Sequence, residues 1–187
     1  VGRSGWETGT LKDDRLDDES DETLRRALRR PTPERYYQLK RALEAGFSIQ
    51  EIAELTFIDP WFIAQLQELV EAERWYAALA TADAAAVRRM KRFGFSDAQL
   101  GALRGESEAE ARAHRLSLGI RPAYKMVDTC AGEFPSSTPY LYGSYDEEAD
   151  APRSGRRSVV ILGGGPNRIG QGVEFDYCCV RAVLALR

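Results

Sequence analysis

The stretch Gly46-Phe-Ser-Ile-Gln-Glu-Ile-Ala-Glu-Leu55 decides the fold class of this chain, because its pattern occurs a second time as Gly94-Phe-Ser-Asp-Ala-Gln-Leu-Gly-Ala-Leu103. In each copy a Gly ends one helix, a Phe follows as a packing anchor, and a Ser caps the next helix. The sequence therefore predicts two helix–turn–helix units that arose from one duplicated pair.

Helix start and stop signals continue on both sides of this repeat. Three positions combine the residue types of an N-cap: Thr32 and Asp59, each followed by Pro, and Asp83. Three Ser residues, Ser48, Ser96 and Ser107, precede a Glu or Gln by three positions, as in a capping box. Asp59-Pro60 is expected to begin the longest helix, and Gly119 is expected to end the last one. We therefore predict a helical domain over residues 32–119.

Composition places the chain among ordinary globular proteins and excludes several classes. The 187 residues are 43% hydrophobic and carry 26 Lys and Arg against 29 Asp and Glu, a net charge of -3 that lacks the basic excess of nucleic-acid-binding proteins. No apolar run approaches the roughly 18 residues of a membrane span. Three Cys, an odd number, and a single His disfavour a disulfide framework, a His-rich metal site and a His-based triad. A cytoplasmic protein without membrane or nucleic-acid partners is expected.

The segments outside the helical domain differ from it in character. Residues 1–31 contain a dense acidic run and are interpreted as an acidic linker or the tail of a preceding domain. Residues 120–157, with Tyr140, Tyr142 and Tyr145, are interpreted as an extended connector and linker.

Residues 158–187 have the pattern of one β-loop-α unit. An apolar run, Val159–Leu162, predicts a strand, and residues 173–186 predict a helix that is buried over most of its surface, including Cys178 and Cys179. A parallel sheet needs several strands, so we expect this unit to be the truncated start of an α/β domain and the chain to be a piece of a longer polypeptide. The predicted fold is thus mainly α, followed by an extended connector and a first β-α unit.

The turn between the expected strand and helix is rich in glycine but lacks both nucleotide motifs. Arg168 stands where the dinucleotide pattern requires its third Gly, and Gln171-Gly172 stand where a P-loop has Lys and Ser or Thr. Two readings stay open: residues such as Asn167 and Arg168 contact an anion, or the loop is only a tight turn. The glycine-rich loop residues are Gly163, Gly164, Gly165, Asn167 and Gly170.

Two further hypotheses concern the helical domain. Trp61, Phe62, Trp75 and Tyr76 are more large apolar side chains than so small a region readily buries, which predicts self-association through them. The alternative function is a stand-alone helical adaptor or a helix-turn-helix DNA-binding module, because residues 47–66 have the spacing of that motif. Acidic and bulky apolar residues at the start of its second helix argue against contact with phosphates and base edges.

Three groups of residues resemble the carbamoyl phosphate synthase large chain family. Val159-Val-Ile-Leu-Gly-Gly-Gly-Pro-Asn-Arg-Ile-Gly-Gln-Gly-Val-Glu-Phe-Asp-Tyr-Cys-Cys179 is similar to the start of the second synthetase half, and Tyr124-Lys-Met-Val-Asp-Thr-Cys-Ala-Gly-Glu-Phe134 to the signature just before it. Trp61-Phe62 and Lys91-Arg-Phe-Gly-Phe-Ser-Asp97 resemble the central helical domain. The resemblance implies an oligomerisation domain followed by the opening of a pre-ATP-grasp, Rossmann-like domain.

The same resemblance implies a function for the intact protein. That protein would be an ATP-dependent carbon–nitrogen ligase that makes carbamoyl phosphate from bicarbonate, ammonia and two ATP for arginine and pyrimidine synthesis, with Mg or Mn. Its partners would be the remainder of the large chain and a glutaminase small subunit or domain. The resemblance places no catalytic or metal-binding residue in this chain, which is expected to be inactive alone. It places Arg168, Gly172 and Glu174 beside the passage that carries carbamate between the synthetase halves.

Overall fold

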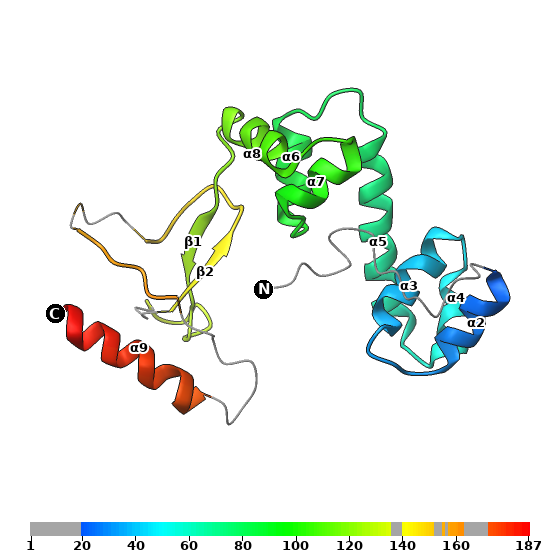
Figure 1. Ribbon diagram of the computed structural model, residues 1–187, viewed down its shortest axis with the longest axis horizontal. Coiled ribbons are helices and arrows are strands. Elements are labelled where there is room, and N and C mark those ends of the chain that lie inside the picture. Colours follow the sequence, from blue (N-terminus) through cyan, green and yellow to red (C-terminus); the bar gives the residue numbers. More distant parts are fainter. Residues whose placement is uncertain (1–19, 136–139, 152–154, 156, 163–171) are drawn as a thin grey trace. The chain divides into compact units, whose positions relative to one another are not determined.

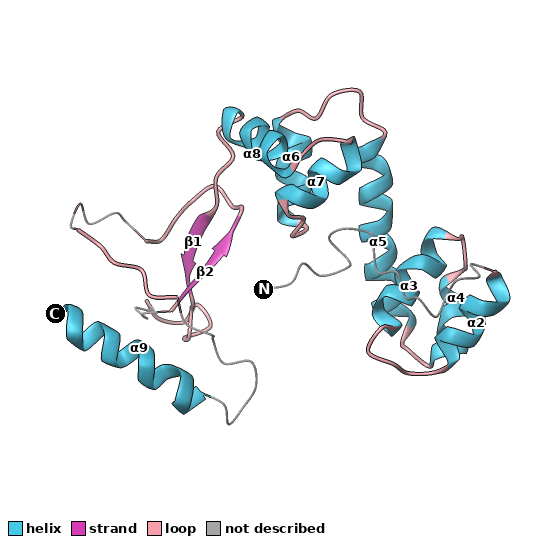
Figure 2. Ribbon diagram, in the orientation of Figure 1, coloured by secondary structure: helices cyan, strands magenta, loops and turns pink. Residues whose placement is uncertain are grey.

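The computed structural model describes residues 20–135, 140–151, 155, 157–162 and 172–187 (Figure 1). The chain divides into two compact units, residues 1–151 and 152–187. The described elements of the first unit are α2 (Asp21–Arg29), α3 (Arg35–Glu44), α4 (Ile49–Thr56), α5 (Pro60–Ala77), α6 (Ala84–Arg92), α7 (Asp97–Arg104), α8 (Glu108–Ser117), β1 (Ala123–Met126) and β2 (Leu141–Ser144). The second unit contains α9 (Gly172–Leu186). As Figure 2 shows, helices dominate, as the sequence predicts.

The helices of the first unit enclose two small cores. The first core lies among α2, α3, α4 and the part of α5 up to Val70, and it is built from Leu24, Leu28, Leu39, Ala42, Leu43, Phe47, Ile52, Ile63 and Val70. The second lies among the C-terminal half of α5, α6, α7 and α8, and it is built from Ala72, Tyr76, Ala82, Ala86, Val87, Met90, Phe95, Leu100, Ala111 and Ile120. The 18-residue helix α5 contributes to both, so it joins the two groups of helices seen in Figure 1.

The helical domain begins earlier than the sequence prediction placed it. Residues 21–29, assigned there to an acidic linker, form α2, whose Leu24 and Leu28 are buried in the first core. The two leucines are four residues apart and therefore lie on one helix face, although the other residues of α2 except Ala27 are charged or polar. Ser20 caps this helix by accepting a hydrogen bond from the backbone N–H of Thr23.

The internal repeat extends over two helices, and the turns that end them, in each copy. Gly46 and Gly94 both end a helix with φ of 92°, and their Phe neighbours, Phe47 and Phe95, are both buried. The next helices also end alike, because Phe57 and Gly105 both have left-handed backbones, with φ of 58° and 70°. The duplication predicted from sequence is therefore present in the backbone as well.

Most of the predicted caps are present, with two differences. Asp59, Asp83, Ser96 and Ser107 cap their helices, and the last two form complete capping boxes with Gln99 and Glu110. The Ser48 hydroxyl accepts from the Glu51 N–H, but the Glu51 carboxylate is held by Arg25 at 2.8 Å instead of returning to the cap. Thr32 does not cap α3, because that helix begins at Arg35 after a turn that Arg35 closes onto the Thr32 carbonyl.

The expected connector contains a small antiparallel sheet. β1 and β2 pair with Ala123 opposite Ser144 and Met126 opposite Leu141. Asp150 strengthens this hairpin, because its N–H donates to the Tyr124 carbonyl and its carboxylate accepts from the Met126 N–H at 2.9 Å. The predicted extended connector thus contains two paired strands of four residues each.

In the second unit, α9 confirms the predicted helix within one residue. The described side chains of α9 do not match the expected burial: Tyr177, Cys178, Val180 and Leu184 are exposed. Residues 159–162 form no strand among the described residues, and Val160 and Leu162 are exposed, since no other described strand pairs with them. In the part of the chain that the structure describes, no helix combines the length and the hydropathy that a bilayer crossing requires.

Candidate functional site

A cluster of buried charges lies where the hairpin meets the second core. Arg115 of α8 donates from Nε and Nη2 to the two carboxylate oxygens of Asp97, at 2.9 and 2.8 Å, and from Nη1 to the Ile120 carbonyl at 2.8 Å. Lys91 of α6 approaches the same Asp97 carboxylate at 3.2 Å and donates to the Phe95 carbonyl. The three charged side chains are 4 to 9% exposed. One carboxylate thus binds two cations away from water.

This arrangement controls the protonation of Asp97. Burial alone raises the pKa of Asp97, but the hydrogen bonds and charges of Arg115 and Lys91 outweigh burial and hold that pKa below its ordinary value. Asp97 is therefore a carboxylate in the folded chain, and its role is to pair with the two cations.

Tyr145 covers this cluster from the hairpin side. Its ring centroid lies 5.0 Å from the Lys91 Nζ and 5.8 Å from the Arg115 guanidinium carbon, and the ring packs against the second core. Both distances are within the range of cation–π attraction. Tyr145, which the sequence left among three tyrosines of the connector, is thus the residue that fastens the hairpin to the helices.

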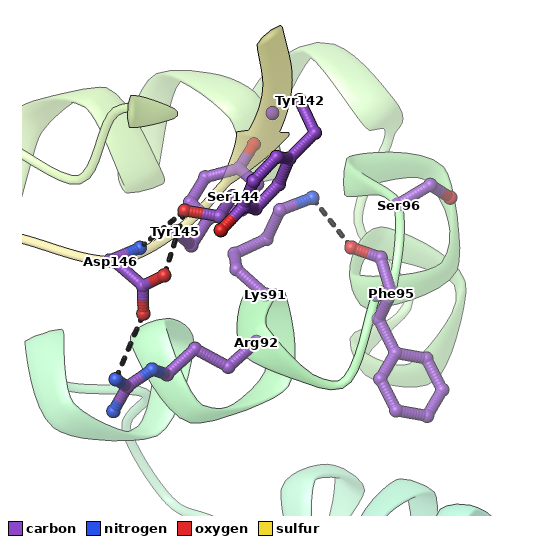
Figure 3. A pocket seen from close by; sticks show the side chains of 10 residues that line it. Lys91, Arg92, Phe95, Ser96, Tyr142, Ser144, Tyr145 and Asp146 are labelled. Atoms are coloured by element: carbon purple, nitrogen blue, oxygen red, sulfur yellow. Dashed lines mark hydrogen bonds and ion pairs between the residues drawn. The ribbon is translucent and has the colours of Figure 1, made fainter. Parts of the chain in front are cut away.

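The next residue adds a second, more exposed contact between the same parts. The Asp146 carboxylate accepts from Arg92 at 3.0 Å and from the Ser144 hydroxyl at 2.9 Å (Figure 3). The hydrogen bond from Arg92, and after it the hydrogen bond from Ser144, hold the pKa of Asp146 below its ordinary value. Because the pair is half exposed, its contribution to stability is small.

A cavity of about 460 Å³ opens between the α6–α7 turn and β2, lined by Lys91, Arg92, Gly94, Phe95, Ser96, Tyr142, Gly143, Ser144, Tyr145 and Asp146 (Figure 3). Its charged groups already pair with one another or with Asp97. Within these lining residues no Cys or His supplies a nucleophile or general base. The cavity thus lies where α6, the α6–α7 turn and β2 meet.

A second candidate site is the exposed side of α5, where the sequence predicts self-association. Trp61 and Phe62 are 61% and 59% exposed and meet edge to face, with ring centroids 5.0 Å apart. Trp75 is 36% exposed, and the Arg89 guanidinium lies 4.6 Å above its ring. Tyr76 differs from the expectation: it is 2% exposed and belongs to the second core, so it is not a surface residue. Burial also raises the pKa of Tyr76.

Sequence reasoning missed one residue of this surface, Phe57, which is 95% exposed at the turn into α5. The repeat could have indicated Phe57, because the equivalent position of the second copy is Gly105, a residue typical of a helix end with a left-handed backbone. The same stretch is unfavourable for DNA: residues 49–73 contain no Lys or Arg, and their exposed acidic residues are Glu54, Asp59, Glu68 and Glu71. A phosphate backbone needs the opposite charge.

The residues predicted around the glycine-rich loop are mostly beyond what the structure describes. Gly163, Gly164, Gly165, Asn167, Arg168 and Gly170 lie outside the described residues. Gly172 is the first residue of α9, and Glu174 belongs to its first turn.

Other reactive side chains do not assemble into a site. Among the described residues, no three His, Cys, Asp or Glu side chains form a group able to hold a metal ion. His114 is exposed and contacts the Ala82 carbonyl at 2.7 Å through Nε2, which ties α8 to the start of α6.

Comparison with known proteins agrees with this architecture. Residues 2–119 match the family described as the oligomerisation domain of the carbamoyl-phosphate synthetase large chain. The chain belongs to the carbamoyl phosphate synthase large chain family. Residues 155–187 match the preATP-grasp domain of carbamoyl phosphate synthase, so the exposed α9 lies in the opening part of that domain.

Several curated relatives of the carbamoyl phosphate synthase large chain family align with the whole segment. The large chain of Gemmatimonas aurantiaca is 68% identical over 188 residues, covering 100% of this chain and 17% of the relative. Those of Neisseria meningitidis serogroup B and Xylella fastidiosa strain 9a5c are 50% and 48% identical, each covering 98% of this chain. The chain thus spans 17 to 18% of the length of these relatives.

Proposed function

We propose that this chain is the assembly and linkage segment of a carbamoyl phosphate synthase large chain. Support comes from the two family matches, which follow one another in the order helical domain then preATP-grasp domain, and from 48 to 68% identity to relatives of that name. The intact enzyme would be an ATP-dependent ligase that forms carbamoyl phosphate from bicarbonate, ammonia and two ATP, for arginine and pyrimidine synthesis.

The observation that carries the assembly role is the exposure of aromatic side chains on a domain with complete cores. Trp61, Phe62 and Trp75 remain at the surface although two clusters of buried residues already fill the helical domain. Large aromatic side chains in water cost hydrophobic free energy and are typical of the anchors of protein–protein interfaces.

The assembly role is tested by sedimentation of the chain and two matched variants. Trp61→Ser should weaken self-association about tenfold or more, because exposed aromatic anchors dominate interface energies. Tyr124→Ser, in β1, removes a ring that is also half exposed, 53%, but lies off the helical surface, and should leave association unchanged. Equal effects of the two variants, or none from Trp61→Ser, would overturn the assignment of this surface.

The linkage role is supported by the fastening of the hairpin. The Tyr145 ring contacts Lys91 and Arg115, and the Asp146 carboxylate pairs with Arg92. Asp146 lies nine residues before residue 155, where the preATP-grasp match begins. These contacts fix the end of the hairpin on the helical domain.

For the glycine-rich loop, the carbamate passage stays a proposal that rests on the family resemblance. Arg168 would offset the desolvation of the carbamate anion, and Gly172 would leave room where a side chain would intrude, beside Glu174. In the full-length enzyme, Arg168→Ala and Gly172→Leu should impair carbamoyl phosphate formation while bicarbonate-dependent ATP cleavage continues. Parallel loss of both rates in a folded enzyme would place the loop in a catalytic site instead.

Cofactors and partners of the intact enzyme are likewise proposals. Among the described residues no three His, Cys, Asp or Glu side chains form a group able to hold a metal ion, and no step of the reaction is assigned to these residues. ATP with Mg or Mn would bind elsewhere in the large chain, and ammonia would come from a glutaminase subunit or domain. The cytoplasmic location expected from the sequence stays a prediction.

A further inference from the structure

The buried charge cluster, which consists of Lys91, Asp97 and Arg115, has no charged counterpart in the first repeat. Gly94 follows Gly46 by 48 residues, and the same interval separates Ser107 and Asp59, the N-caps of α8 and α5. The residues 48 positions before the cluster are Leu43, Ile49 and Gln67. The buried charges are therefore a difference between the two copies.

The first copy packs its helices at these positions without charge. Leu43 is buried in the first core, and Ile49 packs against that core. Charged side chains in place of such residues carry a desolvation penalty, and apolar residues of similar volume often stabilise a fold as well or better. Packing of the helices therefore does not explain the buried charge cluster.

Two contacts connect the buried charge cluster to the chain that follows α8. The Arg115 Nη1 donates to the Ile120 carbonyl at 2.8 Å, where the connector begins. The ring centroid of Tyr145, the residue after β2, lies 5.0 Å from the Lys91 Nζ and 5.8 Å from the Arg115 guanidinium carbon. This part of the chain follows only the second copy, so a contact with it explains why only the second copy carries the charges.

The composition of the cluster suits an aromatic ligand. Both oxygens of Asp97 already accept from cations, Oδ2 from the Arg115 Nη2 and Oδ1 from the Arg115 Nε, with the Lys91 Nζ 3.2 Å from Oδ1. Two cations for one carboxylate leave one positive charge in a buried site. The π face of an aromatic ring attracts a cation, and the attraction is strongest where water is excluded.

We propose that the buried charge cluster is the docking site of the β1–β2 hairpin, in which Lys91 and Arg115 bind the Tyr145 ring and Asp97 positions the two cations. The site selects an aromatic side chain, because its two cations attract a π face and give an aliphatic side chain no such attraction. This inference rests on the proposed linkage function and names the groups that recognise the hairpin.

The chemistry of residue 145 gives the sharpest test. Tyr145→Leu keeps an apolar side chain but has no π face, so the cross-strand amides of β1 and β2 should exchange about tenfold faster than in the wild type. Tyr145→Phe keeps the π face and should exchange at the wild-type rate. Tyr140→Leu replaces an exposed ring just before β2 and is the matched control, without effect on exchange. Equal exchange in Tyr145→Leu and Tyr145→Phe would overturn recognition by the cations.

The NMR spectrum of Lys91 reports the docking contact itself. An aromatic ring shields protons that lie over its face, so the Lys91 methylene protons nearest Nζ should resonate upfield in the wild type and in Tyr145→Phe. In Tyr145→Leu these signals should return to ordinary lysine positions. Unshifted Lys91 signals in the folded wild type would contradict the contact.

Transfer of the residues of the first copy tests whether the charges serve the hairpin or the helices. The triple variant with Lys91→Leu, Asp97→Ile and Arg115→Gln should keep slow exchange in α6, α7 and α8, while β1 and β2 exchange about tenfold faster. This variant differs from Asp97→Asn, which leaves two cations buried without their carboxylate. Unfolding of the triple variant, or a hairpin as protected as in the wild type, would overturn the docking role.

The linkage function and this inference fail in different ways. If β1 and β2 of the wild-type chain exchange as fast as an unfolded peptide, the hairpin is not held, and both proposals fail. If the wild-type hairpin is protected and Tyr145→Leu protects it equally, the linkage function stands and recognition by Lys91 and Arg115 fails.

Discussion

Arg115 donates two parallel hydrogen bonds to the Asp97 carboxylate, from Nε to Oδ1 at 2.9 Å and from Nη2 to Oδ2 at 2.8 Å. Both side chains are less than a tenth exposed. This pair joins the start of α7 to α8, and Lys91 adds α6 to it. Asp97 is thus the centre through which three helices of the second core are joined.

Removal of the Asp97 charge should destabilise the chain strongly. Asp97→Asn leaves Arg115 and Lys91 buried without their carboxylate, which should lower the free energy of unfolding by about 3–5 kcal/mol. Urea unfolding at neutral pH measures this loss. Asp146→Asn, at the half-exposed pair with Arg92, is the matched control and should lower the free energy of unfolding far less, because water screens that pair. Similar losses for the two variants would contradict the central role of Asp97.

The Asp97 carboxylate should also make the stability of the folded chain depend on pH in the acid range. The pKa of Asp97 is lower in the folded chain than its ordinary value, so its stabilising contribution is fully present above the ordinary carboxylate pKa, about 3.9, and is lost as the pH falls through the folded value. Unfolding free energies measured from neutral pH downward should therefore fall more steeply for the wild type than for Asp97→Asn. Parallel curves would mean that Asp97 has no part in acid unfolding.

The Tyr145 ring should stabilise the contact between the hairpin and the helical domain. Tyr145→Ala removes the ring from Lys91 and Arg115 and should cost about 1–2 kcal/mol, with faster amide exchange in β1 and β2. Exchange in α3 and α4, which enclose the other core, should not change. Tyr145→Phe retains the ring and should behave almost as the wild type. A large effect of Tyr145→Phe would assign the role to the hydroxyl instead.

Substitution of Gly101 by alanine should be destabilising, because the position has no room for a methyl group. A Cβ there would lie 2.6 Å from the Glu106 carbonyl oxygen and 3.0 Å from that of Ser107, and backbone atoms cannot move aside cheaply. Gly101→Ala should therefore destabilise by about 1–3 kcal/mol, although Ala normally favours a helix by about 1 kcal/mol. Gly143→Ala, whose nearest neighbour would be the Tyr124 ring at 4.0 Å, is the control. Thermal unfolding that ranks the two in the reverse order would contradict this packing.

The features predictable from sequence are those encoded by neighbouring residues. Asp59, Asp83, Ser96 and Ser107 cap their helices as predicted, because an N-cap acts within three residues of its own position. The repeat around Gly46 and Gly94 was visible for the same reason. The resemblance of the glycine-rich loop and the helical domain also predicted the family, and the matches over residues 2–119 and 155–187 confirm it.

The features that escaped prediction depend on partners far away in sequence. Glu51 leaves the capping box because Arg25, 26 residues earlier, binds its carboxylate. Tyr145 could not be distinguished from Tyr140 and Tyr142 without the positions of Lys91 and Arg115, 54 and 30 residues earlier. The exposure of Phe57 follows from a backbone angle that composition and periodicity do not reveal.

The measurement that tests the central claim most directly is the molar mass of the wild-type chain in solution as its concentration rises. Light scattering should give 20.9 kDa at low concentration and a mass that rises in the micromolar range, because the exposed Trp61, Phe62 and Trp75 are expected to bind a further copy. A mass that stays at 20.9 kDa up to high micromolar concentration would contradict the claim that the exposed aromatic side chains of this chain serve its assembly.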